Sequence, residues 1–210
     1  MNEPGNGSRR VGVFGGTFDP IHIGHLVAAS EALDQLGLDE VVFVPAGRPW
    51  QKDEYADGED RFMMTSLAVA DPARVSASRI ELARRGPTYT VDTLRTLHDF
   101  WGDATQLYFV AGADAVAKLS TWKDVEGLGR VAELAAFPRP GTPTSAIAPA
   151  DDWPRVHMLD MPAIDVSGTA IRERVAAGRS IDFLVPVEVG AYIRAHHLYA
   201  SAGSGRGAEG

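Results

Sequence analysis

Two glycines and two histidines lie close together near the amino terminus, in a pattern that suits a polyphosphate. Gly15 and Gly16 have no Cβ, so the backbone can turn sharply there and approach a phosphate closely. His22 and His25 are three residues apart, which places both rings on one face in the first turn of a predicted helix. A helix amino terminus presents unpaired N–H groups and positive potential to an anion. We therefore predict that both imidazoles donate hydrogen bonds to phosphate oxygens.

A second polar segment, near the carboxyl end, offers similar chemistry. Ser167 and Thr169 can cap and line the start of a predicted helix, and Arg172 falls in its first turn. A guanidinium and two hydroxyls would then lie beside another positive helix end. Alone, this segment is also compatible with an ordinary helix cap, but the first segment favours phosphate binding. Asp19-Pro20 is a turn signal, compatible with a structural or a functional role.

The elements that must position these residues alternate along the chain. Apolar runs predict strands at residues 10–14, 41–44, 74–78, 107–111, 131–137 and 156–159. Amphipathic runs predict helices at residues 22–36, 59–70, 91–100, 169–177 and 186–196. Thr90 is the expected cap of the third helix, and Gly178 the expected end of the fourth. Residues 48–58 and 137–152 are predicted to be loops.

Strands that alternate with helices indicate βαβ units and a parallel sheet. We predict an α/β protein of a single domain, with a Rossmann-like doubly wound parallel sheet over residues 10–200. Residues 1–9 and 201–210 are rich in Gly, Ser and small polar residues and are predicted to be disordered tails. Ligands on such sheets bind at the carboxyl ends of the strands. The glycine pair follows the first predicted strand directly, so it lies where that rule places a site.

Composition narrows the classes of function. The 210 residues carry a formal net charge of −8, and an acidic chain is a poor non-specific binder of nucleic acid. The chain has no cysteine, which excludes disulfides, thiolate metal sites and cysteine nucleophiles. No run approaches the roughly 18 apolar residues that a membrane span needs, and no apolar leader segment is visible. We expect a cytoplasmic protein that binds neither nucleic acid nor membranes. The sequence is compatible with a homo-oligomer.

The run Gly-Gly-Thr-Phe-Asp-Pro-Ile-His-Ile-Gly-His, residues 15–25, resembles the signature of the nucleotidylyltransferase superfamily. Its last four residues spell the tetrapeptide shared with class I aminoacyl-tRNA synthetases. Its first six are similar to bacterial nicotinate-nucleotide adenylyltransferases, and residues 166–172 resemble the second phosphate motif of that family, Ser-x-Thr-x-x-Arg. The resemblance implies phosphate contacts in catalysis by His22, His25 and Arg172. It implies ATP binding by Gly15, Gly16, Thr17, Phe18, Gly24, Ser167 and Thr169.

Weaker matches extend the ATP site. Residues 45–52 resemble a family loop in which a cation reaches the triphosphate, and Lys52 supplies that cation as a further catalytic candidate, although Trp50-Gln51 departs from the common Pro-Pro-His pattern. Ala111-Gly112-Ala113-Asp114 resembles the family's Gly-x-Asp, so Gly112 would let the nucleotide approach and Asp114 would accept a hydrogen bond from a ribose hydroxyl. Arg139 is carried over from an Arg-Arg-Pro-Gly motif whose first arginine is replaced by proline in this chain.

Two more segments resemble the family's acceptor pocket. Residues 86–90, Gly-Pro-Thr-Tyr-Thr, match the segment whose backbone donors bind a pyridine carboxylate, which implies acceptor contacts by Thr88, Tyr89 and Thr90. Residues 120–122, Ser-Thr-Trp, match the segment whose tryptophan stacks on the ring, which implies that role for Trp122. An aromatic face suits a pyridinium, and N–H groups suit a carboxylate. Tyr89 and Trp122 are equally compatible with packing in the core.

The resemblance implies that ATP and nicotinate mononucleotide react to give deamido-NAD and pyrophosphate. The acceptor phosphate would attack the α-phosphorus in line, with Mg²⁺ on the triphosphate and no predicted protein ligand for the metal. Nicotinamide mononucleotide, phosphopantetheine or an alcohol phosphate stay open as acceptors. The acidic chain without a Lys-Met-Ser-Lys-Ser run disfavours a tRNA-binding module, and the intact histidines disfavour a silent nucleotide binder. Residues 48–58 are expected to become ordered when substrates bind.

Overall fold

The structure, a computed structural model, describes residues 8–47, 56–70, 73–138 and 153–200. Its strands are β1 (Arg9–Gly16), β2 (Glu40–Pro45), β3 (Val75–Ala77), β4 (Thr105–Gly112), β5 (Ala132–Phe137) and β6 (Val156–Met158). Its α-helices are α1 (Ile23–Gln35), α2 (Gly58–Ala68), α3 (Thr90–Trp101), α4 (Ala113–Val116), α5 (Val125–Gly129), α6 (Gly168–Ala176) and α7 (Val187–Ala195). A 3₁₀ turn, η1, covers Leu119–Thr121.

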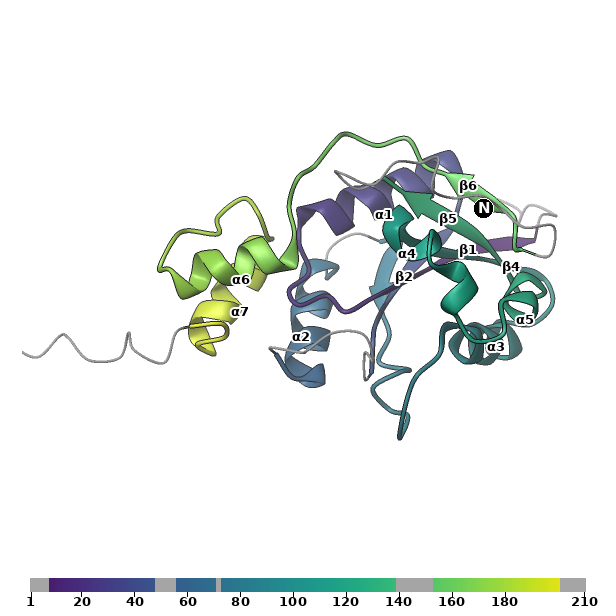
Figure 1. Cartoon of the computed structure of the whole chain (residues 1–210), viewed down its shortest axis with the longest axis horizontal. Coiled ribbons are helices and arrows are strands. Elements are labelled where there is room, and N and C mark those ends of the chain that lie inside the picture. Colours follow the sequence, from purple (N-terminus) through teal and green to yellow (C-terminus); the bar gives the residue numbers. More distant parts are fainter. Residues whose placement is uncertain (1–7, 48–55, 71–72, 139–152, 201–210) are drawn as a thin grey trace, which may run out of the picture.

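The described strands form one parallel sheet in the order β3-β2-β1-β4-β5-β6 (Figure 1). Phe14 of β1 is in register with Phe43 of β2 and with Val110 of β4. The chain runs outward from β1 to β3 and then returns to the other side of β1, so the strand order reverses between β1 and β4. That reversal is the point at which parallel sheets bind ligands. The predicted Rossmann-like α/β fold in a single domain is confirmed.

The two faces of the sheet have separate apolar cores, because successive strand residues point to opposite faces. Phe14 packs with Ala28 of α1 and with side chains from α2, α6 and α7. Val13 packs on the other face with Leu94 of α3 and Leu128 of α5. In Figure 1, α6 and α7 lie beside α2, and Tyr192 of α7 donates a hydrogen bond to Asp60 of α2. None of the described helices has both the length and the apolar character needed to span a membrane.

Each predicted strand and helix is present, with ends that differ by no more than two residues. One predicted cap is wrong: Thr90 lies inside α3, and Tyr89 is the residue that precedes the helix. Gly178 follows α6 with φ +65°, as expected for a glycine at a helix end. The short elements α4, η1 and α5 were not predicted, because a stretch of three to five residues is too short to show helical periodicity.

Candidate active site

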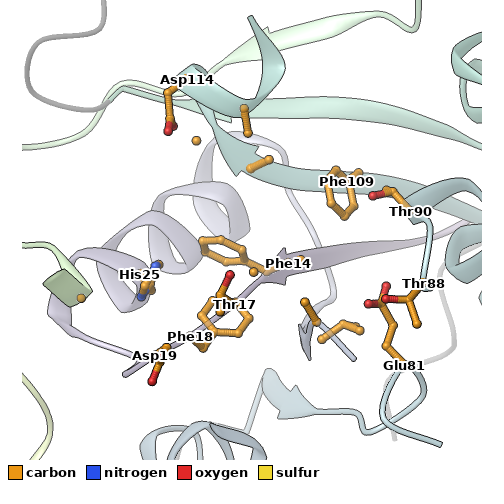
Figure 2. A pocket seen from close by; sticks show the side chains of 18 of the residues that line it. Phe14, Thr17, Phe18, Asp19, His25, Glu81, Thr88, Thr90, Phe109 and Asp114 are labelled. Atoms are coloured by element: carbon orange, nitrogen blue, oxygen red, sulfur yellow. The ribbon is translucent and has the colours of Figure 1, made fainter. Parts of the chain in front are cut away.

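A cavity of about 1000 Å³ opens at the carboxyl ends of β1 and β4. Figure 2 shows Asp19 and His25 on one side of it, Glu81 and Thr88 on another, and Asp114 near the end of β4. The candidate residues that line it are Gly15, Gly16, Thr17, Phe18, His22, His25, Thr88, Tyr89, Thr90, Gly112, Asp114, Trp122, Ser167, Thr169 and Arg172. Gly24 instead lines a smaller adjoining cavity of about 140 Å³. Lys52, Arg139 and most of the loop expected to become ordered lie outside the described residues.

The two histidines stack on each other at the amino terminus of α1. Their ring centroids are 3.7 Å apart with an interplanar angle of 24°, and both side chains are buried. His22 has an extended backbone and precedes the helix, so only His25 lies in the first helical turn. The backbone N–H of His22 donates to Nδ1 of His25 at 3.3 Å. Nδ1 is therefore an acceptor, and a neutral His25 carries its proton on Nε2, where it can be donated to a phosphate.

The end of β1 leaves no room for side chains at Gly15 and Gly16, which were predicted to follow the strand but are its last two residues. A Cβ on Gly15 would lie 2.6 Å from Cζ of Phe109, and a Cβ on Gly16 would lie 2.8 Å from the ring of Phe18. Phe18 itself has φ +51° and packs edge-on against His25. The glycines thus let the turn fold tightly around an aromatic ring that supports the catalytic candidates.

The start of α6 lies against this turn, although about 150 residues separate the two segments. The Arg172 guanidinium donates to the backbone oxygen of Asp19 at 2.6 Å and to Oγ1 of Thr169 at 3.2 Å. Ser167 caps the helix by accepting from the backbone N–H of Ala170 at 3.2 Å. A Cβ on Gly168 would lie 2.8 Å from the Asp19 oxygen, so glycine permits the close approach. Two helix amino termini therefore meet at one cavity, an arrangement that suits a polyphosphate.

The acceptor candidates come from the opposite wall. Tyr89 precedes α3, and Trp122 packs edge-on against Phe109 of β4 with centroids 5.7 Å apart. Lys123 lies 4.3 Å above the Tyr89 ring and pairs with Asp92 of α3 at 3.0 Å. These contacts hold the two candidate segments side by side, although they are separated by some thirty residues of sequence.

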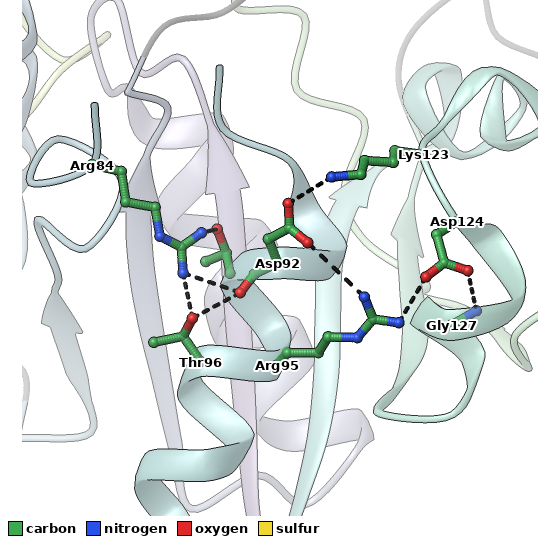
Figure 3. Close-up of polar contacts among 8 residues, drawn as sticks. Arg84, Asp92, Arg95, Thr96, Lys123, Asp124 and Gly127 are labelled. Carbon is green, nitrogen blue, oxygen red and sulfur yellow. Dashed lines mark hydrogen bonds and ion pairs between the residues drawn. The ribbon is translucent and has the colours of Figure 1, made fainter. Parts of the chain in front are cut away.

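Figure 3 shows that polar contacts extend from the ion pair of Lys123 and Asp92 to α5. Arg95 lies 3.9 Å from Asp92 and donates to Asp124 at 2.7 Å, and Asp124 caps α5 by accepting from the backbone N–H of Gly127 at 3.0 Å. The Arg95 hydrogen bond lowers the pKa of Asp124 below its ordinary value. Asp92 and Asp124 thus link α3 to the segment that carries Trp122.

Comparisons with known proteins show the family of the chain. A model of the cytidylyltransferase-like family matches residues 13–174. The probable nicotinate-nucleotide adenylyltransferase of Leifsonia xyli subsp. xyli is 50% identical over 91% of this chain and 94% of the relative. The enzyme of the same description from Clavibacter michiganensis subsp. michiganensis is 47% identical over 96% of this chain and 99% of the relative. The chain belongs to the nicotinate-nucleotide adenylyltransferase family.

Solved structures of the same kind share the fold. Plasmodium falciparum nicotinic acid mononucleotide adenylyltransferase complexed with NaAD superposes with a TM-score of 0.74 at 18% identity, over 91% of this chain and 97% of that chain. A putative nicotinate-nucleotide adenylyltransferase from Vibrio parahaemolyticus gives 0.67 at 16% identity, over 89% and 99%. The adenylyltransferase fold thus covers nearly all of the chain.

One acidic residue of the candidate site could not be predicted from the sequence. Glu81 is 9% exposed and lines the cavity beside Thr88. Its carboxylate accepts from Oγ1 of Thr93 at 2.8 Å and from the backbone N–H of Gly47 at 3.3 Å. A Cβ on Gly47 would lie 2.5 Å from the backbone oxygen of Glu81. Glu81 therefore joins the segment after β2 to α3. Because these residues are distant in the sequence, no local sequence pattern predicts the contact.

Two tyrosines near the carboxyl end of the chain have raised pKa values. Tyr199 donates to Oδ1 of Asp19 at 2.6 Å, and Tyr192 donates to Oδ1 of Asp60 at 2.8 Å. Burial is the main cause that raises the pKa of Tyr199, and the hydrogen bond to Asp19 adds to it. Burial and the Asp60 hydrogen bond raise the pKa of Tyr192 to about 12. Both phenols therefore stay protonated in the folded chain at pH values at which free tyrosine ionises.

We expect these two tyrosines to make the folded state less stable at high pH. Their folded pKa values exceed the ordinary value of 10.0, so the unfolded chain loses these protons first. The free energy of unfolding is unaffected well below pH 10 and falls as the pH rises through and above that value, for Tyr192 up to about 12. Urea unfolding of wild type, Tyr192→Phe and Tyr199→Phe at rising alkaline pH should show a shallower decline in each variant. Equal declines in all three would contradict the assignment.

Proposed function

We propose that this chain transfers AMP from ATP to nicotinate mononucleotide, with release of deamido-NAD and pyrophosphate. One observation carries the proposal: the candidate phosphate residues and the candidate acceptor residues line one continuous cavity. A donor and an acceptor held there would meet at the carboxyl ends of β1 and β4. The names of the curated relatives support the same reaction.

The donor half would be the turn after β1 with the starts of α1 and α6. His22, His25 and Arg172 would contact the phosphates, and Lys52 would add a further cation. The glycines at the end of β1, the turn that follows them and the residues at the start of α6 would surround the triphosphate. Gly24 lines the smaller cavity, which shares His22, Phe137 and Ser167 with the main one. We assign the nucleoside of ATP to the region where the two cavities meet, with Gly112 and Asp114 of the main cavity at its ribose and Arg139 as a further contact.

The acceptor half would be the segment before α3 with Trp122. α3 begins at Thr90, so the first backbone N–H groups of a twelve-residue helix are available to the pyridine carboxylate. Thr90 would supply one of these donors, Thr88 and Tyr89 would supply those of the segment just before the helix, and the Trp122 ring would stack on the pyridine. Tyr89 is braced by Lys123, which keeps the segment in place.

In the proposed step, an oxygen of the acceptor's 5′-phosphate attacks the α-phosphorus of ATP. A new phosphorus–oxygen bond forms as the bond from the α-phosphorus to the bridging oxygen breaks, and pyrophosphate leaves with that electron pair. The protein aligns the two phosphates and stabilises the developing charge. No covalent enzyme intermediate is required, because the acceptor is the nucleophile.

We further propose that Mg²⁺ enters with ATP and assists the departure of pyrophosphate. Among the residues that the structure describes, no group of three or more His, Asp or Glu side chains is placed to hold a metal ion. Mg²⁺ usually keeps several waters and binds substrate phosphates, which suits a cavity of this kind. Such an enzyme would work in the cytoplasm on its small-molecule substrates.

Replacing Trp122 with alanine should weaken binding of the acceptor. Loss of one stacking face is expected to raise KM for nicotinate mononucleotide on the order of tenfold, with little change in KM for ATP. Steady-state kinetics with each substrate varied in turn would measure both constants. Trp101→Ala is the matched control, because that ring contacts Arg9 and does not line the cavity. An unchanged acceptor KM in Trp122→Ala would remove the stacking role.

The acceptor itself is tested by a panel assay of pyrophosphate release. Nicotinate mononucleotide should give the highest kcat/KM. The kcat/KM for nicotinamide mononucleotide should be lower by on the order of tenfold or more, since the amide offers no anion to the α3 amino terminus. Phosphopantetheine and simple alcohol phosphates should give no turnover above background. Equal or higher kcat/KM for nicotinamide mononucleotide would overturn the proposed acceptor and leave the donor assignments standing.

A further inference from the structure

An arginine lies fully buried beneath the donor half of the cavity. Arg61, in α2, is 0% exposed and has the largest side-chain volume among the fully buried described residues. Arginine is among the residues least often buried, because removing a guanidinium from water is expensive unless its N–H groups are well bonded. Complete burial of the Arg61 guanidinium therefore indicates that its charge has a specific role at this place in the fold.

The partners of Arg61 identify that place. Its Nη1 donates to the backbone oxygens of Thr17 and Ala46, both at 2.9 Å, and its Nε donates to that of Ala56 at 3.3 Å. Thr17 directly follows β1 and Ala46 directly follows β2. Both residues line the main cavity. One guanidinium therefore bonds the chain at the carboxyl ends of two adjacent strands.

Those two strand ends are also bonded to each other, since the backbone N–H of Ala46 donates to the backbone oxygen of Gly16 at 2.8 Å. The carbonyl oxygens of Thr17 and Ala46 carry partial negative charge, and oxygens turned toward a triphosphate would repel it. Arg61 holds both oxygens toward itself, away from the cavity, and adds a positive charge where screening by water is weak. The peptide units that follow β1 and β2 are thereby held in one fixed orientation at the edge of the cavity.

We propose that Arg61 is a positioning residue for the triphosphate of the donor nucleotide, which acts by holding the turns after β1 and β2 in their anion-binding shape. It touches neither the reacting atoms nor the acceptor. The proposal rests on the proposed function for its choice of ligand. The proposal predicts different effects on the two substrates, because Arg61 bonds the turn after β1, whereas the acceptor candidates are Trp122 and the residues at and just before the start of α3.

The chain offers a matched control at the opposite end of the sheet. Arg74 also donates to backbone oxygens, those of Leu38 and Asp39, just before β2 begins. Its contacts resemble those of Arg61 in kind, but it does not line the cavity and its neighbours do not either. A lysine at either position keeps the charge but replaces the rigid planar guanidinium, which bonds backbone oxygens through two of its nitrogens, with a single ammonium nitrogen on a flexible stem.

The test compares Arg61→Lys with Arg74→Lys. We expect Arg61→Lys to raise the Kd for ATP, measured by calorimetry without acceptor, by about tenfold, the scale of one charge-assisted hydrogen bond. The KM for ATP should rise with it, while the acceptor KM changes less than about twofold on the same scale. Arg74→Lys should lower Tm and leave both substrate constants unchanged. Arg61→Met, which removes the charge as well, should weaken ATP binding further.

Several outcomes would overturn the proposal. Arg61→Lys could lower Tm and leave ATP binding unchanged, which would make the residue merely structural. Arg61→Lys could weaken the binding of donor and acceptor equally, which would contradict a role for Arg61 that is specific to the donor. If neither variant folds, the side-chain ¹⁵N signals of Arg61 in the wild type decide: they should shift with ATP and not with acceptor alone, and no shift with ATP rejects the proposal. Failure of the proposed function would appear separately, as wild-type protein that binds ATP and transfers nothing.

Discussion

Replacing His25 with alanine should lower kcat on the order of 10²-fold, the usual cost of one donor that stabilises transition-state charge. The orientation of His25 is fixed by the N–H of His22 on its Nδ1, by the stacked ring of His22, and by the edges of Phe14 and Phe18. A ring held in this way is organised before the substrates arrive. The KM for each substrate should change far less than kcat, because the contact strengthens only as charge develops.

The same stacking predicts strong coupling between the two histidines. His22→Ala removes the ring that supports His25, so it should cost nearly as much as His25→Ala, and the double variant should cost much less than the product of the two effects. His196→Ala is the control, since His196 also stacks on an aromatic ring, that of Tyr192, but lies away from the cavity. Near-normal kcat in His25→Ala, or a fully additive double variant, would contradict the role of the pair.

Arg172→Lys should lower kcat/KM for ATP by about tenfold to 10²-fold. The guanidinium bonds the backbone oxygen of Asp19 and the hydroxyl of Thr169 while lining the cavity. A lysine keeps the charge but cannot bond the turn, the helix and a phosphate in one plane. The loss should therefore appear in both KM for ATP and kcat, with the acceptor KM little changed.

The control for this variant lies two residues further along the same helix. Arg174 donates to the backbone oxygen of Ser180 at 2.7 Å, is half-buried, and does not line the cavity. Arg174→Lys should therefore leave both substrate constants at their wild-type values. Should Arg172→Lys behave in the same way, α6 would have no part in phosphate binding.

Much of the fold could be predicted, because its signals are local. The buried run that ends at Phe14 and the β-branched run of β2 give strands, and the spacing of Leu94 and Leu97 gives a helix with one apolar face. Alternation of the two element types then fixes a parallel sheet and the end at which ligands bind. The histidine pair was found for the same reason, since three residues separate its members.

The parts that could not be predicted depend on distant contacts. Arg61 looks like an exposed helical residue in the sequence, and only the approach of the turns after β1 and β2 shows why it is buried. Glu81 lies in no motif, and its role follows from its hydrogen bonds to Gly47 and Thr93. The assignment of Thr90 as a cap failed because Tyr89 already has the extended backbone that precedes α3. Tertiary context decided each of these cases.

Direct transfer of AMP between the two halves of one cavity is the central claim, and product analysis tests it most directly. Purified protein with ATP, Mg²⁺ and nicotinate mononucleotide should yield deamido-NAD and pyrophosphate in equal amounts, identified by mass spectrometry. Omission of the acceptor should abolish pyrophosphate release, because no covalent adenylyl-enzyme is expected. Pyrophosphate released without acceptor, or binding of both substrates with no dinucleotide formed, would contradict the account.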